Sequence, residues 1–357
     1  MTPQVAVVVS GFPRRSETFA VNELLGLADR GMLAGIFATK QGDDGEQQPG
    51  CERLAPLLDV LPGAGATEQG AALASRLGRR HISGIHAYFA HTPATVAEEA
   101  AARLAVRFGF SVHAKDARKV ETSTLADRAN RAACVVACNH DVARDLHDAG
   151  ARVHLVPHGV DLDRFNAGPP PARTGLRLLA VGRLVAKKGF DVLIDALSQT
   201  EPTSTLRIIG DGPERGRLMT RIAALDLGGR VDLVGARTHA TLPAEYAAAD
   251  VVVVPSVVDA SGDRDGLPNV VLEAMASGRP VVGTRVGAIE AAVKHGVTGL
   301  LIAPRSPGAI AAAVHLLADD VHLRMALGRR ARAEATHHYD LARCVDRFAR
   351  LIEAAYG

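Results

Sequence analysis

The 357-residue chain is poor in cysteine and nearly neutral, and each shortage excludes a class of protein. Its four cysteines are too few and too scattered for the disulfide framework of a small secreted domain. Cys134 and Cys138, in the segment CVVAC, would stand about 13 Å apart along one strand, too far to share a metal ion or a disulfide. A formal charge of +2 argues against a general nucleic-acid binder. We therefore expect reduced thiols in the core and no nucleic-acid partner.

Long apolar runs and a dinucleotide-binding loop are also missing. The first apolar run covers only residues 5–9, and no stretch approaches the roughly 20 apolar residues of a membrane span. No charged segment precedes this run, as a signal peptide would require. The first expected strand is followed by SGFPRRSE instead of G-x-G-x-x-G, which disfavours a Rossmann dehydrogenase. These absences predict a cytoplasmic protein. The segment SRLGRRH at 75–81 is either a solvated helix end or a weakly basic edge for peripheral contact with the inner face of the membrane.

What the chain does contain is a repeated alternation of short apolar runs with helical segments. The runs are continuous, rich in β-branched residues and bounded by glycine and proline, which is typical of parallel strands buried on both faces of a sheet. Alanine-rich segments with helical periodicity lie between them, for example 94–107, 191–198 and 309–317. This alternation predicts βαβ units throughout the chain.

One segment divides the chain near its middle. NAGPPPART, at 166–174, contains three consecutive prolines and is typical of a linker. We predict an α/β protein of two doubly wound, Rossmann-like domains that face one another across a cleft. The domains are expected at 1–168 and 169–335, followed by a C-terminal helix at 336–357 that crosses back to the first domain. Ligands of such folds bind at the carboxyl ends of the strands.

Two carboxylates bracket an expected helix start in the segment DGLPNVVLE, at 265–273. Pro268 suits the first helical turn, and the apolar residues that follow it form one buried stripe. Glu273 lies away from that stripe, and Asp265 lies in the preceding loop, beside the free amides of the helix start. Such a set suits a ligand with hydroxyl groups at its ends and phosphate between them. A helix with an acidic cap and one exposed glutamate is the alternative.

Cations and glycines follow two other expected strands in the same half of the chain. Arg183 and Lys188 come after the strand at 177–182, where they form a plausible diphosphate clamp next to helix amides. The segment IIGDGPERGRL, at 208–218, places glycines at another strand-to-helix turn, where backbone can approach a nucleotide closely. Each feature alone is also explained by a capped loop or a solvated base. Their recurrence in order within one domain favours a ligand site.

The order of these motifs resembles that of the retaining glycosyltransferases of family four, which have the GT-B fold. The resemblance covers essentially the whole second half through GRLVAKKG, IIGDGPE, DVVVVPS, DGLPNVVLEAMASGRPVVGT and GVTGLLI. In the first half, PRRSETFAVNEL, HAYFA and VHAKD, followed by VPHGVDLDRF, are similar to the bacterial exopolysaccharide and cell-surface members. One departure is that Asp265 stands where the family usually has glutamate.

The resemblance implies a role for each matching position. Arg183 and Lys188 would hold the donor diphosphate and stabilise it as it leaves. Glu273 would bind the ribose hydroxyls, and Asp265 would lie near the donor sugar. His113 would face the reaction centre.

The residues implied in donor binding are Gly11, Gly182, Arg183, Lys188, Gly210, Asp211, Gly212, Asp265, Gly266, Leu267, Pro268, Asn269 and Glu273. Those implied in acceptor binding are Glu17, Thr18, His113 and Asp116. The residues expected to act in catalysis are His113, Arg183, Lys188 and Asp265. No metal ligand is expected, because the DLD segment at 161–163 is interpreted as a capping turn.

The resulting hypothesis is a retaining transfer of sugar from a nucleotide-diphosphate sugar, with UDP or GDP as the expected nucleotide. The acceptor would be a hydroxyl of a glycan, a lipid-linked saccharide or a secondary metabolite. No cofactor is expected, and transfer would occur on the front face of the sugar. The alternatives are a sugar-nucleotide epimerase or phosphorylase relative and a non-catalytic partner that binds nucleotide sugar. The sequence does not set the sugar, the acceptor or the oligomeric state.

Overall fold

The computed structural model describes residues 2–14, 17–44, 47–113, 120–148, 150–168 and 174–357. The chain divides into two compact units, the first formed by Met1–Gly159 with Leu341–Gly357 and the second by Val160–Asp340. The boundary therefore precedes the proline-rich segment at 166–174, and the C-terminal segment groups with the first unit. Within the described ranges no helix is both long and apolar enough to cross a membrane.

The first unit is a parallel sheet of seven strands in the order β3-β2-β1-β4-β5-β6-β7. Its strands are β1 (Val5–Phe12), β2 (Leu33–Gln41), β3 (Leu58–Val60), β4 (Gly84–Tyr88), β5 (Arg107–Val112), β6 (Val135–Ala137) and β7 (His154–Leu155). Its helices are α1 (Thr18–Asp29), α2 (Cys51–Leu54), η1 (Ala55–Leu57), α3 (Ala66–Leu77), α4 (Thr92–Leu104), α5 (Thr122–Arg131), α6 (His140–Asp148) and α14 (Leu341–Tyr356).

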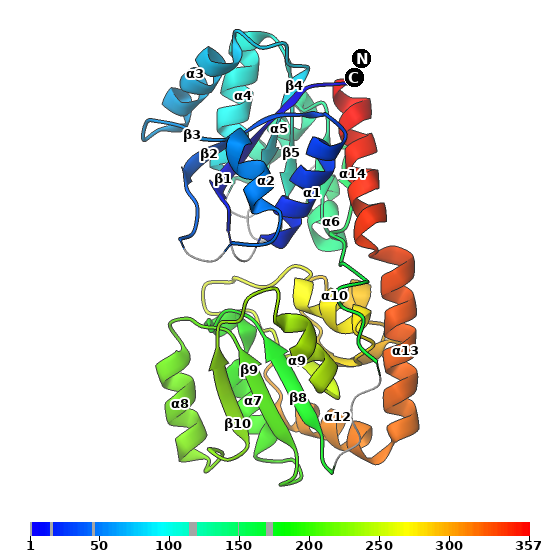
Figure 1. Cartoon of the computed structure of the whole chain (residues 1–357). Helices are drawn as coiled ribbons and strands as arrows, with labels where there is room; N and C mark the ends of the chain where they lie inside the picture. The colour runs from blue at the N-terminus through cyan, green and yellow to red at the C-terminus, as the bar shows by residue number, and fades with distance from the viewer. Residues whose placement is uncertain (1, 15–16, 45–46, 114–119, 149, 169–173) are drawn as a thin grey trace. The chain divides into compact units, whose positions relative to one another are not determined.

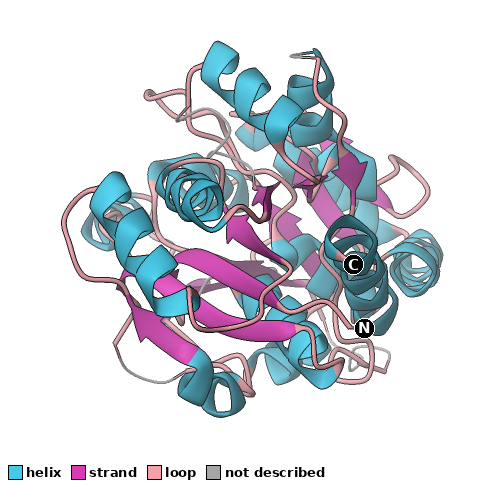
Figure 2. Cartoon of the chain, turned by 90° about the horizontal axis from the view of Figure 1, so that it is seen from above, coloured by secondary structure: helices cyan, strands magenta, loops and turns pink. Residues whose placement is uncertain are grey.

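Strand β1 shows why this half of the sequence reads as continuous apolar runs. All eight of its residues are buried. Val5 and Val7 pack in a core with residues of α1 and α14, whereas Ala6 and Val8 pack in a second core with residues of α3 and α4. Because helices cover both faces of the sheet, neither set of alternating side chains needs to be polar. Figure 2 distinguishes the strands from the helices that lie beside them.

The second unit repeats this architecture with six parallel strands in the order β10-β9-β8-β11-β12-β13. Figure 1 labels β8, β9 and β10 of this sheet. Its strands are β8 (Arg177–Val181), β9 (Thr205–Ile209), β10 (Val231–Gly235), β11 (Val251–Val254), β12 (Val281–Thr284) and β13 (Gly299–Ile302). Its helices are η3 (Ala186–Lys188), α7 (Phe190–Leu197), α8 (Arg215–Ala224), α9 (Leu242–Ala248), α10 (Asn269–Ala276), α11 (Ile289–Ala292), α12 (Pro307–Asp319) and α13 (Val321–His338).

The strand orders confirm the predicted class of two doubly wound α/β domains. The direction of winding reverses between β1 and β4 in the first unit and between β8 and β11 in the second. In doubly wound sheets the carboxyl ends of the strands at such a reversal border the ligand crevice. The expected clamp follows β8, and the expected acid Asp265 follows β11.

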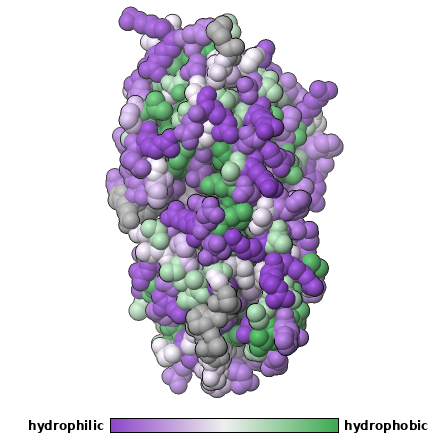
Figure 3. All heavy atoms as spheres, turned by 45° about the vertical axis from the view of Figure 1, so that its right-hand side comes forward, coloured by the Kyte–Doolittle hydropathy of each residue, from purple (hydrophilic) through white to green (hydrophobic). Residues whose placement is uncertain are grey.

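Polar residues cover most of the face shown in Figure 3, and hydrophobic residues appear between them in small groups.

Candidate functional site

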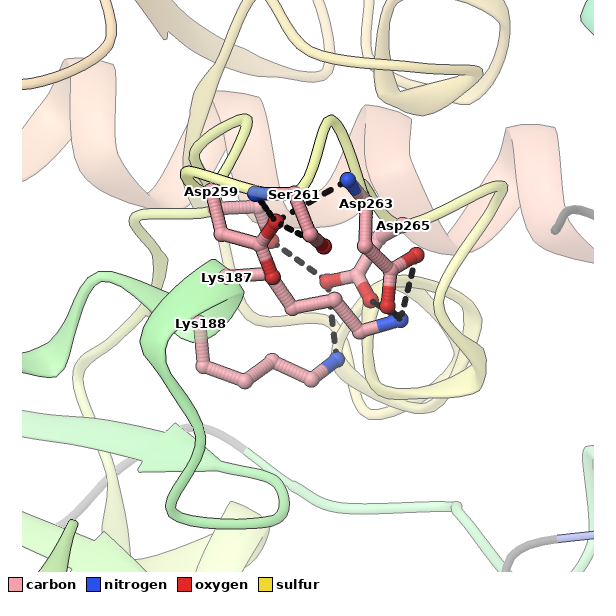
Figure 4. A network of polar contacts seen from close by, with 7 residues as sticks. Lys187, Lys188, Asp259, Ser261, Asp263 and Asp265 are labelled. Atoms are coloured by element: carbon pink, nitrogen blue, oxygen red, sulfur yellow. Dashed lines mark hydrogen bonds and ion pairs between the residues drawn. The ribbon is translucent and has the colours of Figure 1, made fainter.

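A buried carboxylate joins the loops after β8 and β11 in the second unit. Lys188 Nζ donates a hydrogen bond of 2.8 Å to Oδ2 of Asp265, and Ser256 Oγ donates one of 2.7 Å to the same oxygen. Lys187 Nζ lies 3.5 Å from Oδ1 of Asp265 and 3.4 Å from a carboxylate oxygen of Asp263. Figure 4 shows both lysines reaching these acids. The structure thus brings together Lys188 and Asp265, which the sequence assigns to one site.

The charge balance of this cluster favours an ionised Asp265. The residue is only 7% exposed. Burial by itself would raise the pKa of its carboxyl, but Lys188, the Ser256 hydrogen bond and Lys187 together hold that pKa below its usual range. Two lysines are therefore held beside one carboxylate, in the loops that follow the two strands where the winding of the sheet reverses. A phosphate group that enters can take over the lysine contacts.

Arg183 differs from Lys188, although both follow β8. Its side chain is exposed, and its guanidinium makes no ion pair with any residue in the described ranges. An arginine in this state presents its full charge and its planar set of donors to an incoming anion. The structure does not show Arg183 in contact with the Lys188–Asp265 pair.

The glycines after β9 have a packing role in addition to the predicted one. Gly210 has φ of +147°, and a Cβ there would lie 1.8 Å from the carbonyl oxygen of Gly182. Leu184 N donates to the carbonyl oxygen of Asp211 at 2.9 Å. The Asp211 side chain is exposed and accepts a hydrogen bond of 2.8 Å from the amide of Gly212. The turns after β8 and β9 therefore pack backbone against backbone, which requires glycine.

Glu273 is less accessible than its helical position predicts. Helix α10 is buried on nearly all sides, and Glu273 is only 6% exposed. Tyr246 of α9 donates a hydrogen bond of 2.7 Å to Oε2, and His239 Nε2 lies 3.6 Å from Oε1. Burial and then the charge of Glu273 raise the pKa of Tyr246, so the phenol keeps its proton. The alternative of a helix with one exposed glutamate is thus wrong, because Tyr246 of α9 and His239 contact the carboxylate and bury it.

The remaining donor positions of this unit surround the start of α10. Pro268 is the residue before the helix, and Asn269 is its first residue. The carbonyl oxygen of Gly266 accepts a backbone hydrogen bond from Ala288. Leu267 is half-buried and packs against the apolar core. The helix start therefore lies next to the loop that carries Asp265, as the sequence indicates.

In the first unit, His113 lies just after β5 in a cluster of rings. Its ring centroid is 4.5 Å from that of Phe19, 5.1 Å from that of His158 and 5.8 Å from that of Tyr88. Burial and then the neighbouring charge of His158 lower the pKa of His113 well below its usual value. His113 is therefore a neutral imidazole at physiological pH.

His158 is a neighbour of His113 that the sequence motifs do not predict as a site residue. Its Nδ1 lies 3.1 Å from Oε1 of Glu23, and Tyr88 donates a hydrogen bond of 2.6 Å to Oε2 of the same acid. Burial lowers the pKa of His158, but Cys138 and Glu23 outweigh burial and raise this pKa to about 10. Both His158 and Glu23 occur in the quoted segments VPHGVDLDRF and PRRSETFAVNEL. Only the fold brings these two segments together.

The other described site residues that the sequence predicts in the first unit lie near the start of the chain. A Cβ on Gly11 would be 2.6 Å from the carbonyl oxygen of Gln41, so glycine is needed for strand pairing. Glu17 precedes α1 and pairs with Arg14 at 3.3 Å. Burial raises the pKa of Glu17 by more than the pairing with Arg14 lowers it. Thr18 is the first residue of α1. The predicted acceptor residue Asp116 lies outside the described residues.

The DLD segment forms a local turn. Asp161 Oδ1 accepts hydrogen bonds from the amides of Asp163 at 3.1 Å and Arg164 at 2.9 Å. The segment is thus a turn, but no helix follows it in the described residues before β8, so it does not cap a helix as the sequence predicts.

Comparisons with known proteins match both halves of the chain. Residues 16–164 match the model of the family described as Glycosyltransferase Family 4, and residues 175–320 match that of Glycosyl transferases group 1. The chain is 34% identical over 187 residues to the colanic acid biosynthesis glycosyltransferase WcaL of Escherichia coli, which is 51% of this chain and 46% of WcaL. It is 32% identical over 209 residues to the amylovoran biosynthesis glycosyltransferase AmsK of Erwinia amylovora, 56% of this chain and 51% of AmsK. The chain thus spans about half the length of the curated relatives it matches.

The fold is also found in solved structures. The crystal structure of HepE from Anabaena in complex with UDP has a TM-score of 0.84 and 21% sequence identity, and the match covers 98% of this chain and all of that one. The same protein has been solved with UDP-glucose. This likeness shows that the two chains share a fold.

Proposed function

This chain belongs to the glycosyltransferases of family four with the GT-B fold, and we propose that it transfers a sugar from a nucleotide-diphosphate sugar to a hydroxyl group. Two of its relatives, WcaL and AmsK, are glycosyltransferases of exopolysaccharide biosynthesis. The observation that carries the proposal is the lysine-acid cluster at the strand reversal of the second unit. UDP is the favoured nucleotide, since HepE binds UDP and UDP-glucose. GDP is the second choice. The acceptor is a glycan, a lipid-linked saccharide or a secondary metabolite.

The charges of the cluster suit departure of a diphosphate. Negative charge grows on the diphosphate as the bond to the sugar breaks, and preplaced cations stabilise the transition state more than the ground state. Lys188 is held at the site by Asp265, so it loses little freedom when phosphate replaces the carboxylate. Arg183 supplies a second, exposed cation from the same loop. In this proposal the two side chains form the clamp for the leaving group.

The environment of Asp265 supports a transfer that retains the anomeric configuration of the sugar without forming a covalent intermediate. A double displacement needs a free carboxylate as nucleophile. Asp265 instead contacts two lysines and one hydroxyl, which makes it a weak nucleophile. We propose that the departing diphosphate oxygen takes the acceptor proton on the front face of the sugar. His113, a neutral imidazole, would orient the sugar or acceptor.

A donor panel and the first product test this function. UDP-, GDP-, ADP- and dTDP-sugars are compared by thermal shift, where a ligand at 100-fold over its Kd adds about 2.7 kcal/mol of stability. The chain is then incubated with the stabilising donor and a surface-saccharide acceptor. NMR of the first-formed product should show the anomeric configuration of the donor. An inverted product would exclude retention, and a bound donor with no transfer to any acceptor would favour a non-catalytic partner.

We further propose that transfer requires no metal ion. Arg183, Lys188 and the amides at the start of α10 would neutralise the diphosphate without one. Transfer is therefore expected to continue at an unchanged rate in excess EDTA. A rate that vanishes with EDTA and returns with Mg²⁺ or Mn²⁺ would contradict this proposal.

Replacing Glu273 by glutamine is expected to weaken binding of the free nucleoside diphosphate. The amide can still accept the hydrogen bond from Tyr246, but the ribose hydroxyls would lose a charged acceptor, worth about 1.5–3 kcal/mol. Isothermal titration with UDP should show a Kd at least about tenfold higher. Tyr246→Phe is the matched control, since it keeps the carboxylate and should cost stability more than affinity. Unchanged UDP affinity in folded Glu273→Gln would remove this residue from the nucleotide site.

The four cysteines bear on the compartment. All four are free thiols in the structure. Free buried thiols suit a reducing compartment. On this ground we propose that the enzyme works in the cytoplasm, where contact of the basic segment 75–81 with the inner face of the membrane is compatible with a lipid-linked acceptor.

A further inference from the structure

Three potential metal ligands follow three neighbouring strands of the first unit. Val112 of β5 pairs with Ala137 of β6, which in turn pairs with Leu155 of β7. His113 and Cys138 come immediately after the first two strands, and His158 follows the third by three residues. Because parallel strands end at the same edge of a sheet, the fold places two imidazoles and a thiol side by side.

The ligand atoms of these residues are close enough for one ion. One ring nitrogen of each histidine and the sulfur of Cys138 all lie within 4.8 Å of one another, the only such group of three within the described residues. A tetrahedral zinc ion with Zn–N of about 2.0–2.1 Å and Zn–S of about 2.3 Å needs separations of roughly 3.3–3.7 Å. An ion would therefore have to draw the three ligand atoms together through side-chain rotation. The ring centroids of the two histidines are 5.1 Å apart, and their planes are inclined by 23°.

The surroundings are those of a supported metal site. Glu23 lies 3.1 Å from Nδ1 of His158, so it orients the ring and leaves Nε2 as the nitrogen available to an ion. Tyr88 in turn holds Glu23. Asn139 Nδ2 lies 3.3 Å from the sulfur of Cys138 and donates to it. Carboxylate support of a histidine ligand and hydrogen bonds to a thiolate are the interactions that tune zinc centres.

We propose that His113, Cys138 and His158 form a binding site for Zn²⁺ and that zinc bound there inhibits the enzyme. Two nitrogens and one sulfur are the donor set that zinc prefers over Mg²⁺ or Ca²⁺. Zinc binds the thiolate form of cysteine and neutral imidazoles, so its binding is expected to release protons and to weaken as the pH falls. The inhibitory half rests on the proposed function, because coordination removes His113 from its role toward the sugar or acceptor.

Direct metal binding tests the site without reference to activity. The full chain, freed of metal with EDTA and exchanged into buffer, is titrated with Co²⁺. Wild type should develop thiolate-to-cobalt charge-transfer absorption that saturates at one ion per chain. Competition against a chromophoric chelator then gives the Zn²⁺ affinity. Cys138→Ser should abolish the absorption and weaken Zn²⁺ on the order of a hundredfold.

The controls separate this site from other thiols and from folding defects. Cys134→Ser changes another buried thiol, 3.9 Å from His86, and should leave Zn²⁺ affinity unchanged. Glu23→Gln should weaken Zn²⁺ by about tenfold through its effect on His158. If Cys138→Ser fails to fold, Cys138→Ala replaces it. A folded wild type without the absorption, or a folded Cys138 variant with wild-type Zn²⁺ affinity, would overturn the site.

Inhibition is measured separately. Zn²⁺ should slow sugar transfer by wild type and by Cys134→Ser at concentrations near its measured Kd, and EDTA should restore the rate. Cys138→Ser should keep its rate at the same zinc concentration. If zinc binds but the rate of sugar transfer by wild type stays unchanged, the proposal that zinc inhibits the enzyme would be wrong. Absence of transfer by metal-free wild type would contradict the proposed function, while the cobalt titration would still decide the metal site.

Discussion

Lys188→Ala is expected to lower the turnover of sugar transfer by about 10²- to 10³-fold while the protein remains folded. The lost ammonium is the cation that we place at the leaving diphosphate. Folding should survive, because Asp265 keeps the hydrogen bond from Ser256 and the nearby charge of Lys187. The buried carboxylate is therefore never left without a partner. Steady-state kinetics with the donor identified by the panel would measure the effect, and circular dichroism would verify the fold.

The neighbouring lysine provides a matched control. The side chains of Lys187 and Lys188 are 14% and 15% exposed, and both contact Asp265. Lys187→Ala removes the same charge one residue away, from the lysine that also pairs with Asp263. Its turnover should fall by less than about tenfold, the effect of a weaker charge contact. Equal losses of turnover in the two variants would mean that the net charge of the site matters and the position of Lys188 does not. Wild-type turnover in Lys188→Ala would show that Lys188 does not belong to the diphosphate clamp.

The regular part of the fold could be predicted from local pattern. The helical segments expected at 94–107, 191–198 and 309–317 correspond to α4, α7 and α12. Strands buried on both faces leave a continuous apolar run, and the loops that follow them carry glycine and charge. These signals lie within a few residues of one another, so each strand and helix can be predicted from a short stretch of sequence.

The accessibility of Glu273 could not be predicted in the same way. Helical periodicity gives the angle between Glu273 and the apolar stripe of its own helix. It does not say how many other elements cover that helix. Tyr246, which holds the carboxylate, comes from α9, 27 residues earlier in the chain. Burial of a face depends on such distant packing.

The ring cluster of the first unit shows the same limit. Glu23 and His158 are 135 residues apart, and they meet because α1 packs near the end of β7. Sequence order places Cys138 and His113 in separate loops. Their proximity follows from the order of strands in the sheet, with β5, β6 and β7 as neighbours. Strand order depends on which strands pair in the folded protein, and the local sequence pattern does not reveal this pairing.

Asp265→Asn is expected to lower turnover with the donor sugar by about 10²-fold. Binding of the free nucleoside diphosphate should not be weakened. The carboxylate is the predicted contact to the sugar, and in the donor-free protein it also occupies Lys188. Asparagine removes the contact and leaves the lysine available to phosphate. UDP affinity should therefore stay equal or rise. Donor turnover and UDP titration calorimetry, measured on the same preparation, separate the two effects.

The substitution should also cost stability in a way that depends on pH. Loss of one partner from this buried pair leaves Lys188 without its counter-charge, at a cost of about 1–3 kcal/mol at neutral pH. Since the pKa of Asp265 is lowered in the folded state, its contribution is complete above the unfolded pKa of about 3.9 and is lost as pH falls through the folded value. Urea unfolding of both proteins should therefore give a difference that is constant from pH 7 to about 5 and shrinks below about 4.

Asp263→Asn is the matched control for both parts of this prediction. It removes a carboxylate that also contacts Lys187, from the same loop, but one that does not bond Lys188. Donor turnover in Asp263→Asn should stay within a few-fold of wild type, because the clamp lysine and its acid are both kept. A fall in UDP affinity in Asp265→Asn would show that the carboxylate organises the nucleotide site and does not recognise the sugar. A stability difference that grows as the pH falls would mean that Asp265 is not the ionised partner of Lys188.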